Sequence, residues 1–172
     1  MKVPVDEKFR AFIDLAKLLN EGLGITPLLF GSLGLERRLN LDLSAQDIDV
    51  LVPQVFLREQ WPYLKECVGR LGYSLLDLRE HEFWNGVHKT AFAAIEDLGP
   101  FVGIDVSQVP IVEAGYARYM LLTLSQYLAV YRESSKDSYR RDKNNSKDLK
   151  KIAIIEQRLA DSHKGNANRL VE

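Results

Sequence analysis

The stretch that decides the fold, Leu28–Pro53, reads LLFGSLGLERRLNLDLSAQDIDVLVP. An apolar run at its start predicts a buried strand, and Gly31-Ser32 directly follows this run. A second strand is predicted at the end of the stretch, where Asp47 and Asp49 alternate with apolar residues before Pro53 ends the strand. The stretch therefore places a Gly-Ser turn after one strand and two acidic residues at the start of the next.

The two acidic residues and the turn predict a site for a cation and an anion. Side chains two apart on a strand project from the same face, so Asp47 and Asp49 are expected to point the same way. Two such close carboxylates repel each other, and a cation such as Mg²⁺ relieves the repulsion. Gly31 allows close approach of a ligand to the backbone. A helix over 33–39, with Ser32 as its cap, would direct free N–H groups at a phosphate.

The pattern on either side of this stretch predicts a mixed arrangement of helices and strands. After residue 110 the stripe of Tyr116, Tyr119, Tyr127 and Tyr131 is interpreted as helical. The expected fold is α+β, a mixed sheet flanked by helices with a C-terminal helical extension. The predicted helices span 6–21, 33–39, 56–71 (with Pro62 as an alternative start) and 146–160 (Leu149, Ile152, Ala153, Ile155 and Leu159 inward), and the predicted strands span 27–30, 47–53, 73–78, 87–95 and 101–106.

Length and charge bound the class of protein. The chain has 172 residues with 23 Lys and Arg against 24 Asp and Glu, a balance that disfavours a general nucleic-acid or membrane-surface binder. Residues 132–172 hold 11 of the basic and 7 of the acidic residues, so a basic segment follows an acidic body. We expect an α/β core over 1–110 and a helical segment over 111–172 packed on it. A single cysteine, no signal-like N-terminus and no long apolar run predict a cytoplasmic protein without a membrane segment.

These motifs resemble the nucleotidyltransferase superfamily of the DNA polymerase β type. Phe30-Gly31-Ser32 and Asp47-Ile48-Asp49-Val50 match its pattern of an apolar residue, Gly-Ser, a spacer and Asp-x-Asp in order, identity and expected strand context. The resemblance covers roughly residues 7–107, and the small bacterial members, including antibiotic-modifying enzymes, are most similar in size. The spacer of 14 residues between Ser32 and Asp47 is slightly longer than is usual in the family.

The resemblance implies roles for further residues. Asp47, Asp49 and a third carboxylate on a later strand, for which Asp105 is the candidate, would be the catalytic and metal-binding residues. Gly31 and Ser32 would hold the nucleotide. Lys143, Lys147 and either Lys150 or Lys151 are candidates for contacts with the triphosphate, and Arg37 and Arg38 compete with them for that role. Lys147-Asp148 also resembles a basic-acidic pair near the end of small relatives.

The resemblance also implies a reaction, in which Mg²⁺ or Mn²⁺ and a nucleoside triphosphate are bound. A nucleoside monophosphate is then transferred to an acceptor hydroxyl, and pyrophosphate leaves. A small-molecule acceptor is favoured over protein or RNA, and a homodimer is one arrangement that the resemblance allows. Two alternatives stay open. The fold could have lost turnover and serve as a nucleotide- or protein-binding regulatory module, or the basic C-terminal segment could bring a nucleic acid to the site.

Overall fold

A seven-stranded mixed sheet forms the centre of the computed structural model, which describes the backbone of residues 6–136 and 138–171 and the side chains of 6–136 and 147–164. The strand order is β3-β4-β5-β2-β1-β7-β6. The β1 strand runs antiparallel to β2 and parallel to β7, and β2 runs parallel to β5. The strands are β1 (Leu28–Phe30), β2 (Ile48–Val52), β3 (Ser74–Asp77), β4 (Glu82–Trp84), β5 (Lys89–Ala94), β6 (Ile111–Ala114) and β7 (Ala117–Leu121).

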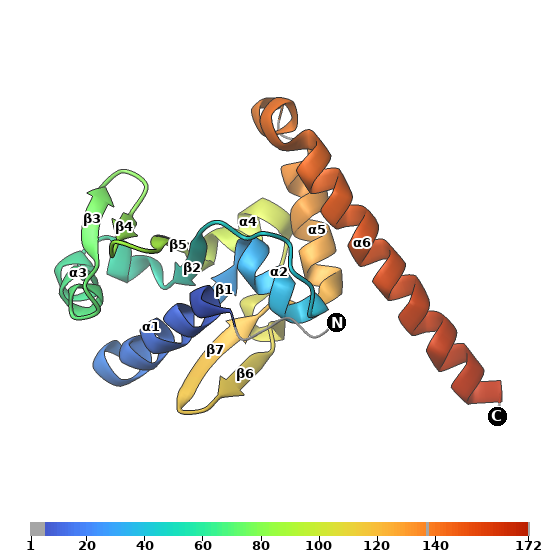
Figure 1. Ribbon diagram of the computed structural model, residues 1–172, viewed down its shortest axis with the longest axis horizontal. Coiled ribbons are helices and arrows are strands. Elements are labelled where there is room, and N and C mark those ends of the chain that lie inside the picture. The colour runs from blue at the N-terminus through green and yellow to red at the C-terminus, as the bar shows by residue number, and fades with distance from the viewer. Residues whose placement is uncertain (1–5, 137, 172) are drawn as a thin grey trace.

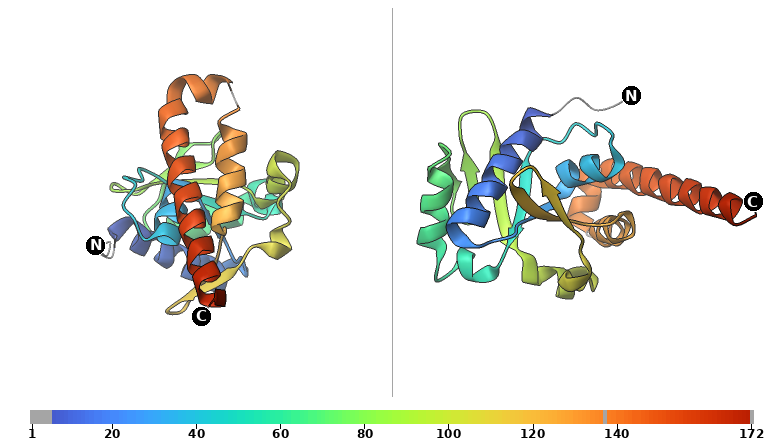
Figure 2. Two further views of the ribbon diagram at one scale, coloured as in Figure 1. Left: turned by 90° about the vertical axis from the view of Figure 1, so that its right-hand side faces the viewer. Right: turned by 90° about the horizontal axis from the view of Figure 1, so that it is seen from below.

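Helices cover both faces of the sheet, which confirms the expected α+β class (Figure 1). In the right-hand view of Figure 2, α1 and α3 lie on one side of the strands, and α5 and α6 lie on the other. The C-terminal part of α6 extends away from the rest of the fold (Figure 1). The α-helices are α1 (Glu7–Leu23), α2 (Gly31–Leu39), α3 (Trp61–Gly69), α4 (Leu98–Val102), α5 (Leu124–Ser134) and α6 (Ser138–Val171), and the 3-10 helices are η1 (Gln54–Leu57), η2 (Ile95–Asp97) and η3 (Val106–Gln108).

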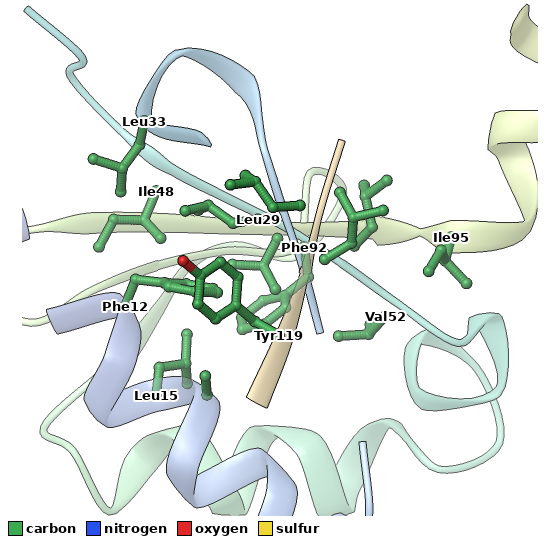
Figure 3. Close-up of a cluster of buried hydrophobic side chains, with 14 of the residues drawn as sticks. Phe12, Leu15, Leu29, Leu33, Ile48, Val52, Phe92, Ile95 and Tyr119 are labelled. Atoms are coloured by element: carbon green, nitrogen blue, oxygen red, sulfur yellow. The ribbon is translucent and has the colours of Figure 1, made fainter. Parts of the chain in front are cut away.

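The core lies between α1, α3 and the central strands, as Figure 3 shows. Phe12 and Leu15 of α1 are fully buried, and the Phe12 ring packs edge-to-face against Tyr119 of β7 with ring centroids 5.2 Å apart. Burial of a large apolar side chain contributes about 1.5–3 kcal/mol, so these contacts fix α1 on the sheet. Leu29 of β1 and Ile48 of β2 are buried in the same cluster, and this burial determines which face of β2 is left for polar residues.

The opposite face of the sheet is joined to α5 by one buried tyrosine. The Tyr127 hydroxyl donates a hydrogen bond of 3.3 Å to the Leu29 carbonyl, and burial raises the pKa of Tyr127 well above its ordinary value. A Cβ atom on Gly34 of α2 would collide with the Tyr127 hydroxyl and lie 2.7 Å from the Leu29 carbonyl oxygen. Gly34 therefore allows α2, β1 and α5 to meet closely behind the Gly-Ser turn.

Three local predictions near the N-terminal half change. The first turn of α2 includes Ser32 and its cap residue is Phe30, so Ser32 is not the cap. The helix predicted over 56–71 begins at Trp61 with Pro62 in its first turn, which confirms the alternative start. The polar link between the strands predicted over 73–78 and 87–95 contains β4, in which Phe83 is buried between a half-buried Glu82 and an exposed Trp84, as the alternation of a strand requires.

The predicted strand over 101–106 is wrong. Pro100 lies within the short helix α4, where its fixed φ and missing N–H are tolerated in the first turn. Gly103 then adopts a left-handed conformation with φ of 72° and ends that helix. Asp105 is consequently not on a strand: it is the residue that caps η3.

The helical prediction directly after residue 110 is also wrong, because β6 and β7 form a hairpin with Gly115 at φ of 62°. Ala117, Tyr119 and Leu121 are buried on alternate positions, so the aromatic stripe follows the period of a strand until α5 begins at Leu124. The expected boundary between core and helical segment, after residue 110, thus falls between β5 and β6, which belong to the same sheet. In α6, Ile155 is buried, but Leu149 and Ala153, which were predicted to face inward, are exposed.

Candidate functional site

The strands β1 and β2 bring the two halves of the motif together. They pair in antiparallel register with Phe30 opposite Asp49, so the residue after Phe30 is adjacent to that carboxylate. Gly31 has φ of 65°, and a Cβ atom on it would lie 2.5 Å from Asp49 Oδ2. Only a glycine fits this conformation beside the carboxylate without strain.

The Asp47 and Asp49 carboxylates lie on the polar side of β2, as predicted. Ile48 between them is fully buried, whereas both acidic side chains are half-buried and line one cavity. Lys89 of β5 reaches across to this pair, with its Nζ atom 3.5 Å from Asp47 Oδ2 and 3.9 Å from Glu82 Oε1. The paired aspartates thus have a protein cation beside them.

The long spacer before Asp47 is held in place by two charged side chains. The Glu36 carboxylate is 5% exposed, and its Oε1 accepts hydrogen bonds from the backbone N–H groups of Leu43 (3.0 Å) and Ala45 (2.8 Å). The Lys8 ammonium donates to the carbonyls of Ala45 (2.7 Å) and Gln46 (2.8 Å). These bonds fix the backbone up to the residue before Asp47.

Burial raises the pKa of Glu36 above its ordinary value of 4.5, although the two backbone N–H donors oppose the shift. The folded state therefore binds this proton more tightly than the unfolded chain does. Stability from this group is fully present below the unfolded pKa and is lost as the pH rises through the folded pKa.

Relative to a Glu36→Gln variant, which keeps an acceptor oxygen but cannot ionise, we therefore expect the wild-type protein to lose stability as the pH rises from below 4.5 towards neutrality. Urea unfolding of both proteins across this range measures the difference in free energy. Glu66→Gln, which changes an exposed carboxylate of α3, is the matched control and should give parallel curves. Parallel curves for Glu36→Gln would contradict the expectation.

One cavity lies between the motif and α6. It has a volume of about 540 Å³ and contains the Ser32 side chain on one wall. Its charged lining comes from two sides: Asp47, directly before β2, and Asp49 of β2 on one, and Lys147, Asp148, Lys150 and Lys151 of α6 on the other. We call this space the lysine cavity, since three lysines face two aspartates across it.

A second cavity of about 370 Å³ lies over the same face of the sheet under α5. Its walls combine polar side chains with aromatic ones; the aromatic residues include Phe101, Tyr127 and Tyr131, and Glu80 is a carboxylate besides Asp49. We call this space the aromatic cavity. Ser32, Asp49 and Lys151 line both cavities, so these three residues form the boundary between them.

The remaining predicted site residues are distributed unevenly. Lys147 lines the lysine cavity, whereas the Lys143 side chain lies outside the described residues. Arg38 donates hydrogen bonds to the carbonyls of Leu121 (3.0 Å) and Leu122 (2.9 Å), so it holds the end of β7 and lines neither cavity.

The structure does not bring Asp105 to the pair of aspartates. Its carboxylate is exposed, accepts hydrogen bonds from the Ser107 hydroxyl (2.8 Å) and N–H (2.9 Å), and lines neither cavity. These bonds lower the pKa of Asp105, the hydroxyl bond being the larger cause. The position beside Asp49 on the parallel strand β5 is Ala91.

Two site residues, Lys89 and Glu80, were missed from the sequence. Lys89 is the first residue of β5, and that it lies beside Asp47 could have been deduced only from the register of β5 against β2. By contrast, Lys150 and Lys151 were alternatives for contact with the triphosphate, and both line the lysine cavity; Lys151 lies one helical turn from Lys147, a spacing that places both on one helix face. Glu80 follows β3 in a turn, where nothing in the local sequence distinguishes a cavity residue from a solvent-exposed one.

The two aspartates could hold one divalent cation such as Mg²⁺ if other ligands completed its coordination. Mg²⁺ is usually bound by one or two carboxylates, substrate phosphates and water, and Asp47 and Asp49 supply two carboxylates at the wall of the lysine cavity. Among the residues whose side chains are described, no group of three or more His, Cys, Asp or Glu residues could hold a metal ion by itself.

Within the same described part, no helix is long and apolar enough to span a bilayer.

Comparison with known proteins gives one strong sequence relative. The chain is 47% identical over 147 residues to the uncharacterized protein YnaI of Bacillus subtilis (strain 168), a match that covers 86% of this chain and 94% of YnaI. Among solved structures, the antibiotic-resistance factor ANT(2'')-Ia aligns over 93% of this chain and 97% of its own, with a TM-score of 0.45 and 12% identity. No family model matches the chain.

Proposed function

This chain belongs to the same family as the YnaI protein of Bacillus subtilis, and we propose that it is a metal-dependent nucleotidyltransferase. The observation that carries the proposal is the meeting of two cavities at Ser32 and Asp49, one lined by lysines and the other by aromatic side chains. Transfer of a nucleoside monophosphate requires this kind of division, because the attacking and leaving oxygens lie on opposite sides of the phosphorus atom.

The lysine cavity suits a triphosphate. Lys147, Lys150 and Lys151 supply positive charge from α6, and the first turn of α2 supplies backbone N–H groups at Gly31 and Ser32. A Mg²⁺ ion bound by Asp47 and Asp49 would neutralise charge that develops on the phosphoryl oxygens. These residues would hold the departing pyrophosphate in this cavity while the phosphorus atom lies near Ser32.

The aromatic cavity suits the acceptor. A hydroxyl group held there would approach the phosphorus atom from the side of Asp49 that faces away from the pyrophosphate. Glu80 lines this cavity but not the lysine cavity, and in this proposal its carboxylate accepts the proton of the attacking hydroxyl. Phe101 and Tyr131 offer flat apolar surface against which a ring of the acceptor can pack.

A nucleotide-binding module without turnover is the second candidate, and one observation favours it. Ala91 occupies the strand position beside Asp49, and Asp105 lies away from both cavities, so the third carboxylate implied by the resemblance is not where a catalytic residue would be. Two carboxylates are enough to bind Mg²⁺ with a nucleotide. The two candidates therefore differ in pyrophosphate release and not in nucleotide binding.

Thermal unfolding with ATP, GTP, CTP or UTP, each with Mg²⁺ or with a chelator, tests both candidates. A nucleotide at 100 times its Kd stabilises the folded state by about 2.7 kcal/mol, which for a chain of this size raises the Tm by about 5–10 °C. We expect such a rise only with Mg²⁺ present. A rise without pyrophosphate release across a panel of hydroxyl acceptors would favour the binding module. A folded protein that responds to no nucleotide would overturn both candidates.

A further inference from the structure

The strand β5 presents a lysine where a metal-binding strand would present an acid. Its residues Lys89, Ala91 and Ala93 alternate along one side, and the register with β2 places Ala91 beside Asp49 and Ala93 beside Leu51. Lys89 lies one position before the first registered pair, Ile48 with Thr90, and so comes beside Asp47. The neighbour of the two aspartates on this strand thus contributes a positive charge and no carboxylate.

The Lys89 ammonium group has two carboxylate partners, and only one belongs to the site. Its Nζ atom is 3.5 Å from Asp47 Oδ2 and 3.9 Å from Glu82 Oε1, and the three side chains are between 24% and 39% exposed. Glu82 lies on β4, the next strand outward, and lines neither cavity. A small movement of the flexible lysine side chain can therefore exchange Asp47 for Glu82 without leaving the ammonium unpaired.

We propose that Lys89 is the resident cation of the site, which neutralises Asp47 in the absence of metal and moves to Glu82 when a nucleotide-bound Mg²⁺ arrives. The inference rests on the proposed function only for the identity of the arriving ion. With Lys89 present, the repulsion between Asp47 and Asp49 is relieved in the free protein. A free divalent ion must displace the ammonium before it gains Asp47, whereas an ion carried by a triphosphate brings phosphate ligands that offset this cost.

Mn²⁺ binding measured by electron paramagnetic resonance, with no nucleotide present, tests the proposal directly. We expect Lys89→Met to bind Mn²⁺ about fivefold more tightly than the wild type, equivalent to the ~1 kcal/mol that a part-exposed ion pair contributes. Lys89→Gln should give the same direction of change and serves if the methionine variant does not fold. Glu82→Gln should weaken Mn²⁺ binding. Of its two carboxylate partners the Lys89 ammonium then keeps only Asp47, so Mn²⁺ must displace it without an alternative partner.

Two further lysine variants test whether the effect is specific to Lys89 or follows from the loss of any positive charge. Lys150→Met removes a charge from the wall of the lysine cavity, which Asp47 also lines and Lys89 does not, and Lys65→Met removes an exposed charge on α3. Both should change Mn²⁺ affinity less than twofold. An unchanged or weaker affinity in both Lys89 variants, or an equal gain in Lys150→Met, would overturn the proposal. Failure of the nucleotide-dependent thermal shift would instead overturn the proposed function and leave the Mn²⁺ result intact.

Discussion

Asp49→Asn should lower the rate of pyrophosphate release by about 10²- to 10³-fold, the loss typical of removing one charge-stabilising group from an active site. Asp49 lines both cavities, so in the proposed reaction its carboxylate faces the phosphorus atom as well as the metal. Asparagine has nearly the same shape but no charge, and it cannot neutralise Mg²⁺. Steady-state release of pyrophosphate from the nucleotide that stabilises the protein measures the change.

Asp47→Asn should give a different kinetic signature. Asp47 lines the lysine cavity but not the aromatic one, so it would bind metal and triphosphate without facing the acceptor. We expect its substitution to act mainly on the KM for the Mg²⁺ nucleotide, while Asp49→Asn also lowers kcat. This split depends on the positions of the two cavities.

Asp105→Asn is the matched control for both substitutions. It makes the same chemical change at an exposed residue that lines neither cavity, and asparagine keeps an oxygen that can accept the Ser107 hydrogen bonds. Its activity should equal that of the wild type. If Asp105→Asn lost activity while Asp49→Asn retained it, the assignment of the site would be wrong.

Neither site substitution is expected to unfold the protein. Neutralising Asp49 removes the repulsion from Asp47 that Lys89 leaves. Neutralising Asp47 removes its part-exposed ion pair with Lys89, a loss of at most about 1 kcal/mol. The free energy of unfolding of Asp49→Asn should therefore equal or exceed that of the wild type. This expectation distinguishes a catalytic carboxylate from a structural one, since loss of a structural one would lower stability and activity together.

The positions of the Gly-Ser turn and of the two aspartates could be predicted from the sequence because the pattern is local there. Gly31, Ser32, Asp47 and Asp49 lie at the ends of two short strands, and a strand of any register puts residues 47 and 49 on one side. The fold class followed for the same reason. An apolar strand, a helix and a second strand are visible as three separate patterns.

The errors arose where one pattern serves two structures. Tyr116, Tyr119 and Met120 fit a helical spacing, but Ala117, Tyr119 and Leu121 also fit the alternation of a strand, and the turn at Gly115 determines which one forms. The prediction for Asp105 failed because Val102-Gly103-Ile104 alternates like a strand, although Gly103 ends a helix. Lys89 and Glu80 were missed because their positions depend on sheet register and cavity shape, which are tertiary properties.

Gly31→Ala should lower the free energy of unfolding by more than backbone strain alone would. Its φ of 65° disfavours a Cβ atom, at a cost of about 1–2 kcal/mol, and the added atom would also lie 2.5 Å from Asp49 Oδ2. The carboxylate must move away, and it leaves the position from which it lines both cavities. We expect a loss of stability together with loss of the Mg²⁺-dependent nucleotide shift, both measured by thermal unfolding.

Gly24→Ala isolates the contact from the strain. Gly24 has φ of 66°, but nothing lies within 4 Å of an added Cβ atom, so this variant carries the backbone cost alone. The excess loss in Gly31→Ala over Gly24→Ala therefore measures the approach to Asp49. In the double variant Gly31→Ala/Asp49→Ala, the excess loss of unfolding free energy should largely disappear, because Asp49 Oδ2 is no longer present. Nucleotide binding should remain lost. Equal losses in the two single variants would mean that Gly31 is required by the turn and not by the carboxylate.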